Sequence, residues 1–365
     1  MASIEKTTDS EARDTVKILK ILGLTAIFVV FALGEWWSRE PQQFNVLEEA
    51  IKQANPSAMT KNESNPESGS SEHGGESAQE QSYESLSADL PVGYTYASTL
   101  SHIANTLLHK PGGYLTNDIM PPGVYLDNIP SWEFGALVML RDAATALRNH
   151  FARDQSQSEQ DPDLAIAEPY FYYEPNSWAL PATEAEYEKG IEALHKYMTR
   201  LQDAGAGKRA QFYPRADNLW QYTEVVIKRL GDLSTRLSSN TSGGNFAPGL
   251  TESELAIASQ SSAAQVPWLE IDNVFYEARG ASWALLHILR AIKHDFRSIL
   301  IDKRAMRTVD IMIRELENSI SPTMSPVVLS GSGYGLFANY LLTMANYIAR
   351  ANAAALDLRD IMNRG

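Results

Sequence analysis

The chain has no cysteine among its 365 residues, so it forms no disulfide, has no thiolate metal ligand and has no cysteine nucleophile. Positive charge is also scarce, because 31 Lys and Arg stand against 45 Asp and Glu, a formal net charge of −14. Proteins that bind nucleic acid carry the opposite balance, since they must neutralise phosphates. We therefore expect no nucleic-acid partner.

The signatures of common catalytic sites are missing as well. The chain has no GxSxG or HExxH motif, and the glycine-rich stretch 330–335, SGSGYG, fits neither a dinucleotide fingerprint nor a phosphate loop. The pairs His102/His109 and His287/His294 are seven residues apart, which is not the zinc-protease spacing. The sequence therefore predicts no metal and no cofactor. It favours a non-enzymatic protein and leaves an activity open.

One long apolar run stands near the N-terminus. Residues 18–37 read ILKILGLTAIFVVFALGEWW, and a helix of about 20 such residues crosses the roughly 30 Å hydrocarbon core of a bilayer. Lys20 lies near one end of the run, and Trp36 and Trp37 at the other end suit the aromatic belt of a membrane interface. We expect residues 16–38 to form a transmembrane signal anchor, with the lipid bilayer as the partner of residues 18–37.

The distribution of basic residues around this run predicts its orientation. Arg13, Lys17 and Lys20 precede its apolar core, and only Arg39 closely follows it. By the positive-inside rule, the tail 1–15 is cytoplasmic and the rest of the chain crosses the membrane. If the source is a Gram-negative bacterium, the prediction is a single-pass protein of the inner membrane with a periplasmic C-terminal domain. A cleaved signal peptide is the competing interpretation, and the GEWW sequence that ends the run is a poor cleavage site.

Two segments are predicted to connect the anchor to the soluble domain. Residues 39–54 form a short juxtamembrane helix, because Phe44, Leu47 and Ile51 fall on one helical face. Residues 55–89 are rich in Ser, Glu and Gly and nearly free of large apolar side chains, which predicts a disordered linker. A flexible chain of about 30 residues typically spans roughly 30 Å, so this linker would let the domain stand off the bilayer.

Residues 90–365 are predicted to be an α-helical soluble domain. Apolar residues recur there at helical spacing, as in Tyr187, Ile191 and Leu194, and no strand-rich block occurs. The expected fold is all-α, a multi-helix bundle that follows the single transmembrane helix. Within it, residues 239–264 are rich in Ser, Gly and Ala, which predicts a mobile loop.

The segment 112–134 contains the first candidate site, a group of polar and aromatic residues in an expected loop. Its members are Asn117, Asp118, Asp127, Trp132 and Glu133. Two carboxylates beside aromatic rings are what the cleavage or binding of a glycan requires, and the same oxygens can bind calcium. Asp and Asn are also common turn formers, and Glu133 would lie in the first turn of a helix, where the helix dipole favours it. The structural interpretation is favoured, with a glycan site as the alternative.

A second candidate lies in the expected helix after residue 270. Glu277, Arg279 and Arg290 form a charged cluster there. Arginine side chains suit a carboxylate or a phosphate, so the cluster is a candidate anion site. Glu277 and Arg279 are two residues apart and do not face each other on a helix, so structural ion pairs with other elements are the favoured interpretation.

Four long strings carry a resemblance to a known family. They are KPGGYLTNDIMPPGVYLDNIPSWEFGALVMLRD, QFYPRADNL, VFYEARGASWALLHILRA and SGSGYGLFANYLLTMANYIARANAAALDLRD. The chain resembles the bacterial domain-of-unknown-function family 2333 over nearly all of residues 90–365. The resemblance implies a proteobacterial source and an inner-membrane anchor. It implies no particular activity, substrate or catalytic residue.

The layout of anchor, linker and bundle, without a coherent set of catalytic residues, indicates an interaction or scaffold component of the cell envelope. Its expected partner is another envelope protein. The alternative is an envelope enzyme or binder that acts on peptidoglycan or another glycan through residues 112–134.

Overall fold

The computed structural model shows an all-α protein, as the sequence predicts. It describes residues 2–55, 90–153, 159–203, 209–239, 270–322 and 340–364, and side chains within these ranges from residue 17 onward, except those of residues 239 and 340. No strand occurs in these ranges. The predicted mobile loop 239–264 and the predicted linker 55–89 lie, except for their first residues, outside the described part of the chain.

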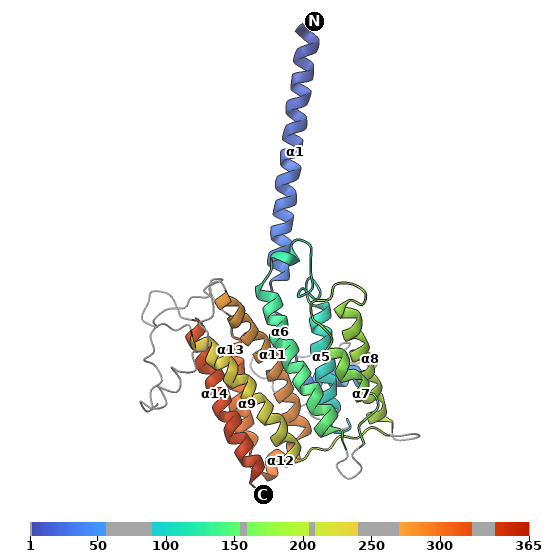
Figure 1. The fold of residues 1–365 in the computed structure, drawn as a ribbon, viewed down its shortest axis with the longest axis vertical. Coiled ribbons are helices and arrows are strands. Elements are labelled where there is room, and N and C mark those ends of the chain that lie inside the picture. Colours follow the sequence, from blue (N-terminus) through green and yellow to red (C-terminus); the bar gives the residue numbers. More distant parts are fainter. Residues whose placement is uncertain are drawn as a thin grey trace, which may run out of the picture.

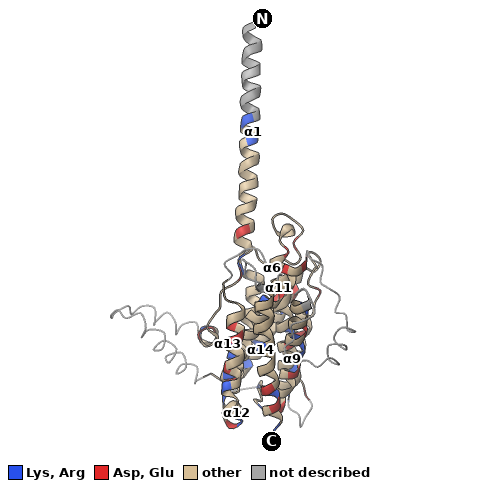
Figure 2. Ribbon diagram, turned by 90° about the vertical axis from the view of Figure 1, so that its left-hand side faces the viewer, with Lys and Arg blue, Asp and Glu red and all other residues tan. Residues whose placement is uncertain are grey.

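The longest helix, α1 (Ala2–Trp37), projects alone from one end of the bundle, and the C-terminus lies at the opposite end (Figure 1). Its part Lys17–Trp37 is long and apolar enough to cross a membrane, and almost all of it is exposed. Figure 2 shows this stretch without charge between its two lysines and one glutamate near the bundle. The helix is therefore suited to be a membrane anchor or a signal sequence.

The bundle is built around α11, which packs against α5, α6 and α13. On one side of it α9 and α14 pack together, and on the other side α8 packs against α5 and α7 (Figure 1). The helices are α5 (Tyr94–His109), α6 (Asn128–Ala146), α7 (Leu164–Phe171), α8 (Thr183–Gln202), α9 (Ala216–Ser239), α11 (Ile271–Asp295), α12 (Arg297–Asp302), α13 (Met306–Ser319) and α14 (Tyr340–Asn363). A short π-helical turn, η2 (Leu147–Phe151), continues α6.

Helices α6 and α11 cross with their backbones in contact. A Cβ atom on Gly135 would lie 1.9 Å from the carbonyl oxygen of Glu277, and one on Gly280 would lie 1.9 Å from that of Trp132. Only glycine permits this approach from both sides. The rings of Trp132 and Trp283 then meet beside the crossing, 5.2 Å apart, and both are buried.

A short helix outside the predicted soluble domain also belongs to the bundle. Helix α2 (Val46–Ala54) packs on α5, and Val46, Ala50 and Ile51 are buried. Asn45 caps α2, because its Oδ1 accepts the backbone N–H groups of Leu47 and Glu48. Within the segment 39–54 predicted as a juxtamembrane helix, only residues 46–54 are helical, and this helix buries its apolar face on the bundle.

This packing changes the expected role of the linker. We call residues 40–54 the strap, since they run from the end of α1 along the bundle and are held there. The chain enters the bundle before residue 55 and continues in it from residue 90. Residues 55–89 therefore do not separate the anchor from the bundle, and the bundle does not hang from a long tether. The packed unit begins near Glu40 instead of residue 90.

Candidate functional site

The segment 110–116 is held to the bundle by a buried ion pair. Lys110 Nζ lies 2.6 Å from Glu133 Oε1, and both side chains are almost fully buried. The Glu133 carboxylate also accepts the backbone N–H groups of Leu115 and Thr116, and Lys110 donates to the carbonyl of Gly113. Burial raises the pKa of Glu133, and the charge of Lys110 opposes that rise. Glu133 is thus completely engaged inside the protein.

The other residues of the 112–134 candidate point in different directions. Asn117 Nδ2 donates to the carbonyl of Ser177 and to Glu184 at the start of α8. Trp132 is fully buried and Asp127 is exposed at the N-terminus of α6. Asp118 is half-buried, and burial followed by the charge of Glu184 raises its pKa.

The structure therefore does not bring this candidate set together around one opening. Glycoside cleavage needs two carboxyl groups that flank the same bond, and Glu133 has no surface from which to reach one. The arrangement supports a structural role for Glu133, Trp132 and Asn117. Asp127 remains accessible to a ligand.

The second candidate cluster separates into three independent ion pairs. Glu277 pairs with Arg236 of α9, with 2.8 Å between its Oε2 and the Arg236 Nη1. Arg290 lies 2.6 Å from Glu317 of α13 and also donates to the side chain of Gln43. Arg279 pairs with Glu40 of the strap. No common anion site joins these three residues.

Arg279 and its neighbours on α11 hold the strap. The Arg279 guanidinium makes two hydrogen bonds to the Glu40 carboxylate, of 2.6 and 2.8 Å. It also donates to the carbonyls of residues 319–321, which end α13. One turn further along α11, Trp283 Nε1 donates to the carbonyl of Gln42. A buried arginine thus joins the strap, α11 and α13.

His287 continues this contact one turn later. Its Nε2 accepts the backbone N–H of Phe44 at 3.0 Å, and its Nδ1 lies 2.7 Å from the carbonyl of Trp283. The ring stacks on Phe44 with centroids 3.9 Å apart and planes parallel within 1°. This pattern assigns the proton to Nδ1. Desolvation lowers the pKa of His287 to about 3, so the ring is neutral near pH 7.

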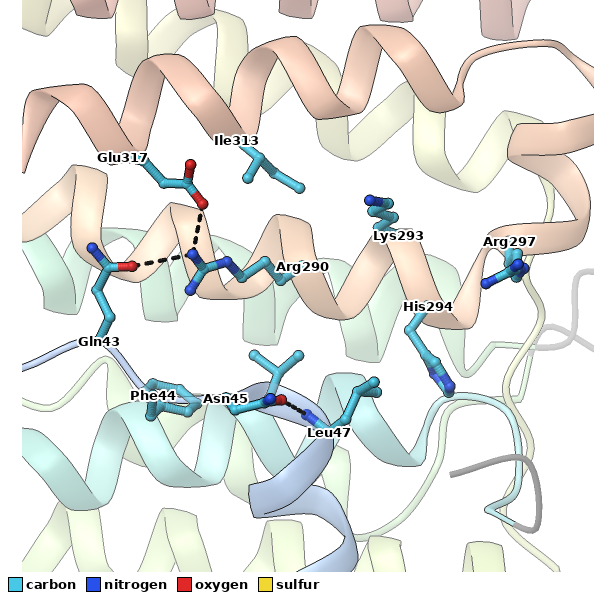
Figure 3. A pocket seen from close by; sticks show the side chains of 11 residues that line it. Gln43, Phe44, Asn45, Leu47, Arg290, Lys293, His294, Arg297, Ile313 and Glu317 are labelled. Atoms are coloured by element: carbon cyan, nitrogen blue, oxygen red, sulfur yellow. Dashed lines mark hydrogen bonds and ion pairs between the residues drawn. The ribbon is translucent and has the colours of Figure 1, made fainter. Parts of the chain in front are cut away.

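Beside the strap lies a groove of about 470 Å³. It runs between residues 43–47 of the strap, α11 and α13, and Figure 3 shows the side chains that line it. Three of them carry a positive charge, Arg290, Lys293 and Arg297, and His294 is a fourth basic side chain. The only carboxylate in the lining is Glu317. The groove is therefore a concave surface with an excess of basic groups on an acidic protein.

The four basic residues of this groove form one helix face. They are spaced i, i+3, i+4 and i+7, so α11 and the first residue of α12 present them on the same side. Lys293 pairs with Asp310 at 2.7 Å, and His294 Nδ1 lies 3.2 Å from Asp295 Oδ1. Of this face, Arg290 alone was predicted as part of an anion site, and His294 was considered only as a metal ligand. The helical spacing was a readable signal for the other three.

The described part of the chain contains no cluster of three or more His, Asp or Glu side chains arranged to hold a metal ion. The groove offers cations and hydrogen-bond donors. Arginine and lysine side chains bind carboxylates and phosphates by charge-assisted hydrogen bonds. The groove can accept an anionic or acidic segment.

Together these features define a class: an all-α bundle fixed by a packed strap to one apolar N-terminal helix. The chain belongs to DUF2333, a family described as uncharacterised proteins conserved in bacteria, whose model matches residues 10–365. The match includes α1 and the strap as well as the bundle. No curated protein and no solved structure matches the chain.

Proposed function

We propose that this DUF2333 protein is a non-enzymatic scaffold of the bacterial cell envelope. In this proposal α1 spans the inner membrane with its N-terminus in the cytoplasm, and the bundle lies in the periplasm against the membrane. The groove beside the strap binds an acidic segment of another envelope protein. The excess of Arg13, Lys17 and Lys20 over Arg39 at the ends of the apolar run supports this orientation.

The observation that carries the scaffold proposal is that the strap is held on the bundle by buried contacts. The strap contacts Arg279 and His287 through residues 40–44, and these contacts join the bundle to α1 as well as stabilising the fold. The bidentate Glu40–Arg279 pair and the Phe44–His287 stack fix the bundle relative to the last turn of α1. A bundle with a fixed position at the membrane can present one surface to neighbouring membrane proteins.

The groove is the surface that best suits such a partner. It borders the strap, and its basic face stands out on a chain with a net charge of −14. Charge of one sign in a concave site attracts a segment of the opposite sign and discriminates against others. An acidic segment of a protein is therefore the expected ligand.

Site-specific photo-crosslinking in intact cells tests this proposal. A photo-reactive residue in place of Lys293 should capture a reproducible protein partner, and one in place of Lys196, which is exposed on α8, should not. Adding Arg297→Glu should reduce the capture several-fold, whereas Lys196→Glu should leave it unchanged. Equal capture at both positions, or none at Lys293, would contradict the proposal.

The orientation has its own test. A reporter that is active only outside the cytoplasm should be active when fused to the C-terminus of the chain. Activity of a cytoplasmic reporter at the same place would overturn the proposed topology and the envelope function with it.

Glycan binding through residues 112–134 is the alternative. It has less support, because Glu133 and Trp132 are buried and only Asp127 of the acidic set is exposed. Incubation of the full-length protein with peptidoglycan sacculi distinguishes the two proposals. Release of soluble fragments that is lost in Asp127→Asn would favour the alternative.

A further inference from the structure

Residues 119–126, which we call the apolar loop, expose large apolar side chains at one end of the bundle. They read IMPPGVYL and carry no charge. Met120 is 71% exposed and Tyr125 is 76% exposed, and Ile119 and Val124 are about half-exposed. Large apolar side chains that are exposed together in one short segment suit a contact with something outside the bundle.

The conformation of the apolar loop is fixed from within. Pro122 and Gly123 are buried, and a short 3-10 turn, η1 (Gly123–Tyr125), follows them. A Cβ atom on Gly123 would lie 1.9 Å from the Asp118 carboxylate, so the acidic side chain lies against the loop backbone. The buried Lys110–Glu133 pair holds the preceding segment. The apolar side chains are therefore presented outward by an ordered support.

The apolar loop touches the part of α1 that belongs to the candidate membrane span. A Cβ atom on the buried Gly34 would lie 3.7 Å from Pro122 and 4.0 Å from Leu126. The indole of Trp37 lies on the backbone of Gly112, where a Cβ atom would be 2.7 Å from its Cγ. In Figures 1 and 2 this segment lies at the end of the bundle from which α1 emerges.

The position of this contact along α1 shows at which depth of a bilayer the apolar loop would lie. Gly34 precedes Trp37 by three residues, which is about 4.5 Å along a helix at 1.5 Å per residue. Both residues belong to the apolar stretch Lys17–Trp37. Side chains next to Gly34 would therefore lie at the boundary between the headgroups and the hydrocarbon when α1 spans a bilayer.

We propose that the apolar loop inserts into the surface of the lipid bilayer, in the leaflet through which α1 joins the bundle. This inference rests on the membrane anchoring that the proposed function includes. The surface is continuous with α1, is uncharged over eight residues, and offers a proline-rich turn with Met, Ile, Val and Tyr. Apolar groups gain free energy in the interface, and tyrosine is enriched there.

This insertion gives the bundle a second attachment to the membrane. A single helix leaves the bundle free to rotate about the helix axis, whereas a second contact beside it fixes which face is turned to the bilayer. The loop and the strap then act together, because the strap fixes the bundle to α1 and the loop fixes it to the lipid.

Spin-label accessibility in vesicles tests the proposal on the full-length chain. The protein has no cysteine, so a single nitroxide can be placed by Met120→Cys or Tyr125→Cys. A label at Phe28→Cys in α1 is the reference for a site in the membrane. A label at Ile301→Cys on α12, at the far end of the bundle, is the reference for a site in solvent, and the Ile301 side chain is exposed as those of the loop are. The vesicles contain phosphatidylethanolamine and phosphatidylglycerol, with oxygen and a water-soluble nickel chelate as relaxants.

We expect the labels at Met120 and Tyr125 to respond to oxygen and to be several-fold less accessible to the nickel chelate than the label at Ile301. High nickel accessibility at the loop with a lipid-buried Phe28 would overturn the loop proposal alone. A water-exposed Phe28 would overturn the anchor on which the proposed function depends. Labels at the loop that are shielded from both relaxants would indicate a protein contact and would also overturn the proposal.

A charged pair of substitutions gives an independent outcome. Met120→Asp with Val124→Asp should release the loop, so that a label at Tyr125 becomes accessible to the nickel chelate. Ile301→Asp should leave the Tyr125 label buried. Since the three side chains are exposed, all these variants should keep the helical content of the parent protein. A Tyr125 label that stays in lipid despite both aspartates would contradict insertion of the loop.

Discussion

The strap and the apolar loop both adjoin the end of α1, and they direct their side chains in opposite ways. The strap turns Glu40 and Phe44 onto α11, where they meet Arg279 and His287. The polar groups that support the apolar loop, among them Asp118 and Glu133, are turned inward, and the loop leaves Met120 and Tyr125 outside. The strap therefore stabilises the bundle. The exposed side chains of the loop contribute nothing to the stability of the bundle, and they indicate a contact with something outside it.

The largest expected effect comes from breaking the support of the loop. Lys110→Ala leaves Glu133 as an unpaired carboxylate in a fully buried site, and losing one partner of a buried ion pair costs about 3–5 kcal/mol. We expect a loss of that size in the free energy of unfolding, measured with denaturant.

A matched control for this variant is Lys189→Ala, which removes a half-exposed lysine from its pair with Glu186 and should change the free energy of unfolding far less than Lys110→Ala does. Replacing both charges, as in Lys110→Met with Glu133→Gln, should recover much of the loss, because the glutamine oxygen still accepts the backbone N–H groups of Leu115 and Thr116. A small effect of Lys110→Ala alone would mean that Glu133 is not fixed as the structure describes it.

The next largest effect comes from releasing the strap. Glu40→Ala leaves the buried Arg279 with its carbonyl partners and without its carboxylate, which should cost about 2–3 kcal/mol. Hydrogen exchange of the α2 backbone should become faster, because the strap begins at this pair. Glu317→Ala, which breaks the more exposed pair with Arg290, is the control and should cost at most about 1 kcal/mol.

The sequence predicts the elements of this structure better than their contacts. The stripe of Tyr187, Ile191 and Leu194 forecasts α8, and the apolar run forecasts the exposed part of α1. Helical periodicity is local, so it is readable from the sequence. The Glu40–Arg279 pair joins residues 239 positions apart, and no local pattern carries it.

The candidate loop shows a second limit of sequence reasoning. Asp and Asn are expected on turns at the surface, yet Asn117 and Glu133 are turned inward to satisfy backbone and side-chain groups of the loop and α8. The large apolar side chains of the apolar loop are exposed to solvent instead. Which side of an irregular segment faces the bundle depends on packing, because such a segment has no period from which to read a face.

The pH dependence of the free energy of unfolding reports on the contact between the strap and His287, and measuring it requires no substitution in the strap or the loop. The pKa of His287 is about 3 in the folded state, against its ordinary 6.5, so below pH 6.5 only the unfolded state takes up the proton. Stability is therefore lost as the pH falls from 6.5 towards 3, by about 2 kcal/mol between pH 7 and pH 5.

The pairing of Glu49 with His102 adds to this dependence at lower pH. Its hydrogen bond lowers the pKa of Glu49 from 4.5 to about 2, so its contribution disappears as the pH falls through that window. His287→Gln keeps an acceptor for the Phe44 N–H and should flatten the dependence between pH 7 and pH 5, as measured from denaturant midpoints. An unchanged slope in this variant would show that His287 does not remain neutral in the bundle.

The smallest effect on stability is expected at the exposed face of the loop. Tyr125→Ser removes a side chain that is 76% exposed, so it should change the free energy of unfolding in detergent by less than about 0.5 kcal/mol. Phe44→Ser in the strap is the contrasting variant, because it removes a ring that stacks on His287, and should cost several times more. The two aromatic rings lie near the same end of α1, so a comparable loss for both would show that Tyr125 stabilises the bundle itself. If only Phe44→Ser lowers the free energy of unfolding, the ring of Tyr125 does not stabilise the bundle, as expected of a side chain that contacts lipid.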